Sequence, residues 1–140
     1  MKPALLDINV LLALAWPNHQ HHGAAHAWFR SESRHGWATC GFTQIGFIRL
    51  SSNPAYTPAA VSPQEAAGLL QRLIAHQHHR FWPAPPAAEP AFFAKTLGHQ
   101  QVNDAYLVAI ARAQKGRVVT LDTRLPVHGG GDDAVLVIPT

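Results

Sequence analysis

Three aspartates, Asp7, Asp104 and Asp122, each stand next to an apolar run of the sequence. Only eight acidic residues occur among the 140, so an acidic composition does not explain three at such positions. A charged side chain beside a buried segment costs free energy unless it is paired or binds a cation. Mg²⁺ commonly binds one or two carboxylates together with phosphate oxygens and waters. The pattern therefore indicates a metal site that cleaves phosphodiester bonds.

Each aspartate taken alone has a simpler explanation. Asp104 precedes a helical segment, as an N-cap residue does, and Asp122 precedes Thr-Arg, as a turn residue does. Three separate capping or turn residues at one edge of a fold explain the pattern less well than one shared metal site does. Clustered carboxylates repel one another, and such a cluster normally implies a cation.

The composition is that of one mildly basic domain, which we expect to span residues 1–140. The net charge is +3, from 11 basic and 8 acidic residues, and there are ten histidines. Eight of the basic residues are arginines, whose forked guanidinium suits phosphate or carboxylate. This balance permits nucleic-acid binding but does not establish it.

The single cysteine, Cys40, excludes an intramolecular disulfide and a thiolate metal cluster. No apolar run reaches the roughly 18 residues of a membrane span. Asp7 and Asn9 interrupt the apolar run at residues 4–16, which argues against a signal sequence. We therefore expect a cytosolic protein without membrane association.

Strand-like and helix-like segments alternate along the chain. The patterns predict strands at residues 3–6, 36–39, 79–82, 117–121 and 135–138. They predict helices at residues 9–16, 19–34, 43–50, 62–74 and 105–114, and one more short helix containing Phe92, Phe93 and Leu97. Crossovers of this length suit parallel strands, which favours a three-layer α/β fold with a mainly parallel sheet. The glycine triplet at residues 129–131 is interpreted as a flexible turn.

This architecture would gather the three aspartates. Ligand sites of open α/β sheets lie beyond the carboxyl ends of the strands. Asp7 and Asp122 directly follow predicted strands, and Asp104 opens a helix that can start at the same edge. We therefore expect the three carboxylates to converge.

Four segments occur in the order seen in PIN-domain nucleases: residues 5–12, 43–50, 103–107 and 119–122. More narrowly, the chain resembles the VapC-type toxins of bacterial type II toxin–antitoxin pairs, from about residue 2 to residue 125. The resemblance implies a PIN-like domain with Mg²⁺- or Mn²⁺-dependent endoribonuclease activity on RNA. It also implies a cytosolic homodimer that is neutralised by a cognate antitoxin protein.

By position, the resemblance assigns Asp7, Asp104 and Asp122 to metal binding and catalysis. Gln44 occupies the second acidic position, where the family often has Glu, and is counted with the catalytic residues. The neutral amide removes one negative charge, so we expect weaker metal binding. The polar residues expected next to the metal or the substrate are Asn9, Thr120, Arg49 and Arg124.

Two other classes of function remain open on the sequence. With Gln44 in place of an acid, the chain could be a PIN-like scaffold that binds RNA or an antitoxin without cleavage. A small α/β phosphatase would also gather aspartates at strand ends, but position 9 is Asn and the Asp-x-Asp pair is missing. The phosphatase hypothesis therefore ranks below the others.

Histidines and tryptophans offer further candidates. His22 and His26 are spaced at i and i+4 with His19 nearby, and a transition metal could bind there. A second histidine cluster consists of His76, His78 and His79. Three tryptophans could stack on bases or pack in the core: Trp16, Trp37 and Trp82. Neither histidine cluster has a cysteine or a His-Glu-x-x-His motif.

Overall fold

The central sheet contains five parallel strands within residues 2–128 and 133–140, which the computed structural model describes. The order across the sheet is β3-β2-β1-β4-β5, and every neighbouring pair is parallel. The predicted mainly parallel sheet is therefore confirmed. The glycine triplet at residues 129–131 lies outside the described residues. The strands are Ala4–Leu6 (β1), Trp37–Cys40 (β2), His79–Trp82 (β3), Arg117–Thr120 (β4) and Val135–Val137 (β5).

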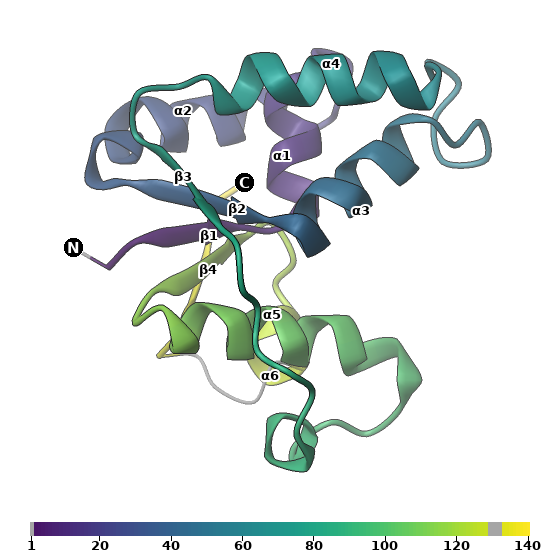
Figure 1. Ribbon diagram of the computed structural model, residues 1–140. Coiled ribbons are helices and arrows are strands. Elements are labelled where there is room, and N and C mark those ends of the chain that lie inside the picture. Colours follow the sequence, from purple (N-terminus) through teal and green to yellow (C-terminus); the bar gives the residue numbers. More distant parts are fainter. Residues whose placement is uncertain (1, 129–132) are drawn as a thin grey trace.

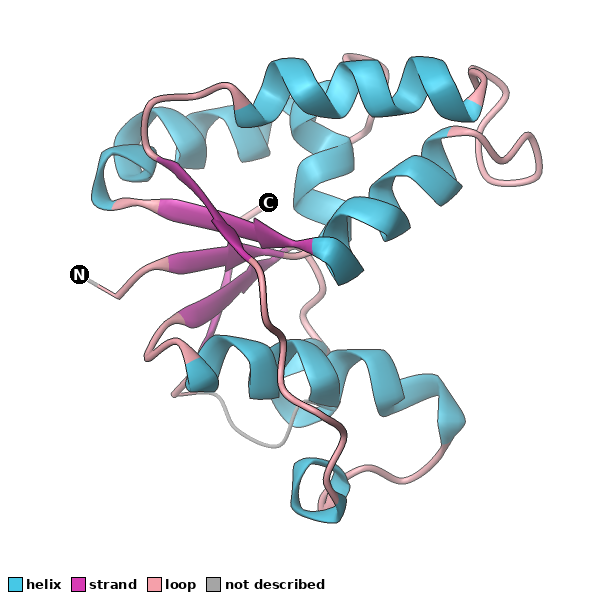
Figure 2. Ribbon diagram, in the orientation of Figure 1, coloured by secondary structure: helices cyan, strands magenta, loops and turns pink. Residues whose placement is uncertain are grey.

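Helices cover both faces of this sheet. Figure 1 shows α1–α4 on one face and α5 with α6 on the other, and Figure 2 shows the strands between these helical layers. The predicted three-layer architecture is confirmed. Among the described residues, no helix is long and apolar enough to cross a bilayer. The α-helices are Ile8–Ala15 (α1), His22–Glu32 (α2), Gly41–Ser51 (α3), Pro63–Ile74 (α4), Val102–Ala113 (α5) and Leu125–His128 (α6); the 3₁₀ helices are Ser33–His35 (η1), Pro90–Phe93 (η2) and His99–Gln101 (η3).

The central strands are apolar on both faces. Leu5 belongs to the same buried cluster as Leu107 and Ile110 of α5. Its neighbour Leu6 belongs to the cluster on the opposite face, with Leu11 of α1. A strand that is buried on both sides has an uninterrupted apolar sequence. This is why β1 could be recognised from the sequence despite its three residues.

The strand order reverses direction between β1 and β4. From β1 the chain moves outward through β2 to β3, and then returns to β4 on the other side of β1. The connections after β1 and β4 leave the sheet on opposite faces, and a crevice opens at the carboxyl ends of such strands. Asp7 directly follows β1, and Asp122 follows β4 by two residues. The topology thus places both carboxylates at this crevice.

Two helices begin earlier than the sequence predicts. Helix α3 begins at Gly41 with Cys40 as its cap, and the Thr43 hydroxyl accepts a 3.1 Å hydrogen bond from the Cys40 N–H. Thr43 therefore lies within the first turn, and its hydroxyl reaches back to the start of the helix. Helix α5 begins at Val102, so Asp104 lies in the first turn and does not cap it. A carboxylate there still interacts favourably with the helix dipole.

The helix predicted around Phe92, Phe93 and Leu97 is only the four-residue 3₁₀ helix η2. Leu97 is 91% exposed, so this apolar spacing does not mark a buried helix face. A segment this short forms too few hydrogen bonds to offset the cost of helix nucleation. Pro90 at its start also removes one backbone donor.

Candidate active site

Asp7 is a buried carboxylate at the start of α1, with 8% of its surface exposed. Its Oδ1 accepts a hydrogen bond from the Ile8 N–H at 2.7 Å, so Asp7 is the N-cap of α1. Its Oδ2 accepts a hydrogen bond from the Thr120 hydroxyl at 2.7 Å. Charge-assisted hydrogen bonds from two separate elements fix the carboxylate in one orientation.

Thr120, the last residue of β4, connects three polar residues of the site. Besides donating to Asp7, its hydroxyl oxygen accepts hydrogen bonds from the Asp122 N–H (3.0 Å) and from Asn9 Nδ2 (3.3 Å). Asn9 Oδ1 in turn accepts from the Leu121 N–H at 3.2 Å. A hydroxyl has one donor and two acceptor sites, so these bonds occupy all of them. Thr120 is fully buried, and its hydroxyl positions Asp7, one of the expected metal-binding residues.

Burial raises the pKa of the Asp7 carboxyl to about 6, because few waters solvate its charge. The hydrogen bonds from Thr120 and Ile8 oppose this shift, and the charges of Asp104 and Asp122 add to it. The charges of Asp104 and Asp122 thus each act on the Asp7 carboxylate. Such repulsion is relieved by a cation.

Asp104 and Asp122 line a common cleft with a volume of about 580 Å³, together with Gln100, Gln101 and Arg124. We call it the acidic cleft. Asp122 Oδ1 accepts hydrogen bonds from the Arg124 backbone N–H (2.9 Å) and from its Nε (3.2 Å). This short loop after β4 therefore holds a carboxylate and a guanidinium side by side.

These donors suit a hard divalent cation, although they do not enclose one. Within residues 2–128 and 133–140, no three His, Cys, Asp or Glu side chains are close enough to hold a metal ion together. Mg²⁺ does not need such a cage, because it keeps several waters and binds through one or two carboxylates plus substrate oxygens. The oxygen donors and the mutual repulsion of the aspartates fit Mg²⁺ or Mn²⁺.

Gln44, on the first turns of α3, is directed to β2. Its Nε2 donates to the Thr39 hydroxyl at 3.0 Å, and the same hydroxyl lies 2.8 Å from His79 Nε2. Burial lowers the pKa of His79, which favours a neutral ring that can accept a hydrogen bond from Thr39. The Gln44 amide therefore has a partner on β2, the strand next to β1. The amide is thus used to join α3 to the sheet.

The two arginines expected to contact phosphate have different surroundings. Arg124 lines the acidic cleft and is held against Asp122. Arg49 is exposed on α3 and lines none of the clefts described here. Phosphate contact stays a prediction for both, with a geometric basis for Arg124 alone.

The histidine pair of α2 stabilises the end of α1. One ring nitrogen of His22 lies 2.7 Å from the Ala13 carbonyl, and one of His26 lies 3.0 Å from the Leu14 carbonyl. The last carbonyls of a helix have no partner within it, so these contacts satisfy them. The transition-metal alternative receives no support from the described residues, which include no group of three suitable ligands.

Sequence reasoning missed several polar residues around the aspartates. Gln100 and Gln101 line the acidic cleft, and His19, Gln20 and His21 line a neighbouring cleft beside Asp122. They lie in turns and short connections, where no periodicity reveals which side chains face a site. The available signal was the spacing of Gln100 and Gln101, which precede Asp104 by four and three residues.

Comparisons with known proteins agree with this fold. A family profile described as the PIN domain matches residues 4–130. The chain is similar to Ribonuclease VapC39 of Mycobacterium tuberculosis, with 41% identity over 125 residues, 87% of this chain and 90% of the relative. It is also similar to Ribonuclease VapC38 (40% over 119 residues, 85% and 84%) and Ribonuclease VapC29 (40% over 136 residues, 97% and 96%) of the same organism.

A solved structure, PAE2754 from Pyrobaculum aerophilum, has the same fold. Its TM-score to this chain is 0.60 at 20% identity, covering 96% of this chain and 83% of the other. The chain therefore belongs to the PIN-domain family, in its VapC-type group. The sequence-based resemblance is confirmed.

Proposed function

We propose that this protein is a metal-dependent endoribonuclease and the toxin of a type II toxin–antitoxin pair. The observation that carries the proposal is the position of Asp7 and Asp122 where the strand order reverses, with Asp104 lining the same cleft as Asp122. The relatives at about 40% identity, which are named ribonucleases, give RNA as the substrate.

In this proposal Asp7, Asp104 and Asp122 are the residues that would hold Mg²⁺ or Mn²⁺. When bound, the cation lowers the pKa of a water and polarises the scissile phosphate. Thr120 and the Ile8 N–H keep the Asp7 carboxylate in place, so it need not reorganise when substrate arrives. Arg124, at the mouth of the acidic cleft, contacts a phosphate of the bound strand.

A cognate antitoxin, a homodimeric state and a cytosolic location belong to the same proposal. The relatives named VapC support the first of these. The charged fraction of 14% is well below the usual quarter, which is compatible with a surface partly covered by a partner.

A non-catalytic RNA-binding scaffold is the second candidate function. Two observations favour it: the neutral Gln44 at the second acidic position, and the described residues' lack of three metal-binding side chains at ligand distance. The two candidates differ in one measurable property, the cleavage of RNA.

Cleavage of end-labelled RNA by the purified protein tests the proposal. We expect cutting in Mg²⁺ or Mn²⁺ and none in EDTA, with activity restored when the metal is added back. Cleavage that continues in excess EDTA contradicts a metal-dependent mechanism. Metal-independent RNA binding without any cleavage supports the scaffold instead.

Gln44→Glu is expected to lower the Mg²⁺ concentration needed for half-maximal cleavage by about fivefold, since one added charge near the cation contributes about 1 kcal/mol. Glu has no N–H for Thr39, so the Thr39 hydroxyl must turn toward the new carboxylate. Gln44→Ala is the matched control, because it removes the amide without adding charge. An unchanged or higher Mg²⁺ requirement in Gln44→Glu would show that position 44 does not act on the metal.

A further inference from the structure

Three neighbouring clefts form a track that begins at Asp104 and Asp122, because each cleft shares lining residues with the next. The acidic cleft shares Asp122 and Arg124 with a second cleft of about 300 Å³, which continues to His19 and Gln20. His19 and Gln20 also line a third cleft of about 440 Å³. We call the second the histidine cleft and the third the aromatic cleft. A ligand long enough to fill this track would reach from the proposed metal site to the far end of α1.

The aromatic cleft is lined by the rings of Trp16 and Tyr56. Trp16 Nε1 donates a 3.0 Å hydrogen bond to the Ser51 hydroxyl at the end of α3, which fixes the indole. Tyr56 is 48% exposed. By contrast, Trp37 and Trp82 are buried in the core, and of the three tryptophans considered for base stacking Trp16 is the one that lines these three clefts.

Tyr56 is exposed although its loop is ordered by hydrogen bonds. The N–H groups of Tyr56 and Thr57 donate to the Asn53 carbonyl (3.0 and 3.1 Å), and the Val61 N–H closes the loop on the Ser51 carbonyl (3.1 Å). An aromatic side chain on such a loop loses little conformational entropy when it binds a ligand. The loop therefore presents a preformed stacking surface.

The other groups along the track suit a nucleotide strand. Asn18 and Gln20 supply side-chain amides beside the rings, and amides can bond to the edges of a base. The aromatic cleft is lined by no acidic residue. His19 lies between the rings and Arg124, which lies at the acidic cleft.

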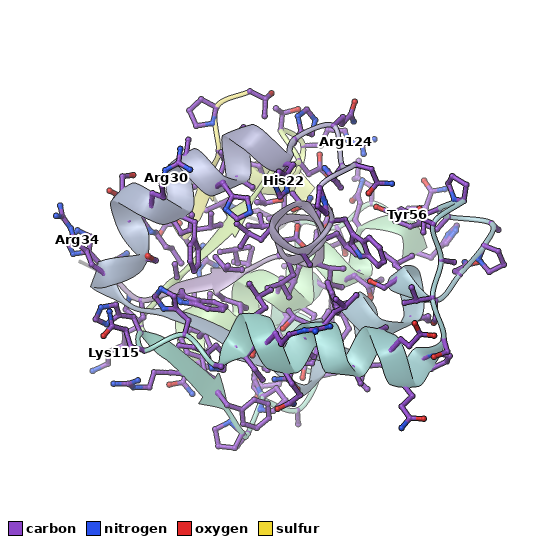
Figure 3. The ribbon with its side chains drawn as sticks, turned by 90° about the horizontal axis from the view of Figure 1, so that it is seen from above. His22, Arg30, Arg34, Tyr56, Lys115 and Arg124 are labelled. Carbon is purple, nitrogen blue, oxygen red and sulfur yellow. The ribbon has the colours of Figure 1, made fainter. Side chains whose placement is uncertain are left out.

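Figure 3, which looks onto the layer of α1–α4, agrees with this path. Arg124 and Tyr56 lie on the same side of the molecule, at the carboxyl ends of the strands. Arg30, Arg34 and Lys115 lie at the opposite end. The track is thus separate from that basic group.

We propose that the aromatic cleft binds one unpaired base of the RNA, stacked on Tyr56 beside Trp16, while the strand passes His19 and Gln20 toward the scissile phosphate. This inference rests on the proposed ribonuclease function. It makes the protein selective for single-stranded RNA, because a paired base cannot enter the cleft. The observation that favours RNA over a protein ligand is that the clefts share lining residues as far as Asp122, one of the aspartates of the proposed metal site.

The test measures binding without cleavage, in the Asp7→Asn background at one fixed salt concentration. The probe is a fluorescein-labelled single-stranded RNA of roughly 12 nucleotides, read by anisotropy. Adding Tyr56→Ala is expected to weaken binding about tenfold, the loss of one stacked base. Tyr56→Phe keeps the stacking surface and should bind within about twofold of the background protein. Phe81→Ala is the matched control, because Phe81 is 49% exposed on β3 and lines none of the three clefts.

An abasic scan of the same RNA locates the stacked base. Removing one particular base should weaken RNA binding by the Asp7→Asn protein about tenfold. The same removal should not further weaken RNA binding by the protein that also carries Tyr56→Ala. Equal affinities of the two proteins, or losses that add at every abasic position, overturn the inference. If these occur while the wild-type protein still cleaves RNA, only the subsite is refuted. If the RNA neither binds nor is cut, the proposed function fails together with it.

Discussion

Asp7→Asn is expected to abolish RNA cleavage and, in EDTA at neutral pH, to increase the free energy of unfolding. The loss of activity should be at least about 100-fold, because metal-assisted hydrolysis relies on several kcal/mol of charge stabilisation. The gain in stability follows from the raised pKa of Asp7, about 6 in the folded protein against 3.8 for the unperturbed group. The buried charge of Asp7, which the proposed chemistry requires, therefore destabilises the wild-type fold.

The pH dependence of this effect has a definite sign. Between pH 4 and pH 6 the folded protein holds a proton on Asp7 that the unfolded chain has released, so stability falls as the pH rises. The full cost is present above about pH 6 and is at most about 3 kcal/mol. Asn carries no charge and escapes this cost. Its amide has one acceptor oxygen in place of two, so it keeps only one of the hydrogen bonds from Ile8 and Thr120, and we expect a net gain of about 1–2 kcal/mol at pH 7.5.

Urea unfolding of both proteins at pH 4 and pH 7.5 measures this difference. Asp7→Asn should be the more stable protein at pH 7.5 in EDTA, and the gap should shrink toward pH 4. Mg²⁺ should stabilise the wild type and leave Asp7→Asn nearly unchanged, because a ligand stabilises only the state that binds it. A variant that is less stable than the wild type at pH 7.5 would show that the buried charge is not costly.

Gly46→Ala is expected to destabilise the fold by about 1–2 kcal/mol and to slow cleavage about tenfold. A Cβ at Gly46 of α3 would overlap Cδ1 of Ile8 and lie 2.8 Å from its Cγ1. Ile8 begins α1, and its N–H holds the Asp7 carboxylate. Displacing Ile8 would therefore disturb both the contact between α1 and α3 and the position of Asp7. The preference of helices for Ala over Gly offsets only part of this cost.

Gly68→Ala is the matched control for this substitution. Gly68 lies on α4, and a Cβ there would meet no atom within 4 Å. It should stabilise the fold by about 0.5–1 kcal/mol. Ile8→Val removes Cδ1 but keeps the Cγ atoms, so it should recover part of the stability that Gly46→Ala loses. Equal urea midpoints for Gly46→Ala and Gly68→Ala would contradict the close packing of α3 on Ile8.

The sequence predicted the sheet and two of the three aspartate positions well, for a physical reason. Strands buried on both faces are continuous apolar runs, so the residues that follow them can be placed at a sheet edge without knowing any contact. Asp7 and Asp122 were located in this way. The start of α4 is equally local, because Ser62 and Glu65, three residues apart, form its capping box.

The rest of the candidate site depends on contacts between distant segments. The Thr120 hydroxyl bonds to Asp7 across a separation of 113 residues, and no local pattern reveals that pairing. Gln44 was placed at an acidic position by resemblance, but its hydrogen bond to Thr39 depends on how α3 returns to β2. The lining of the three clefts comes largely from turns and loops, whose side-chain directions follow from tertiary packing.

The most direct test of the central claim is the initial rate of RNA cleavage in Mg²⁺ for Asp7→Asn, Asp104→Asn and Asp122→Asn. Glu89→Gln is the control, because Glu89 is an exposed carboxylate that lines none of the clefts. The three aspartates are expected to act as one centre, so each substitution should reduce the rate at least about 100-fold while the control keeps the wild-type rate. Cleavage near the wild-type rate by any of the three variants would contradict a shared metal centre.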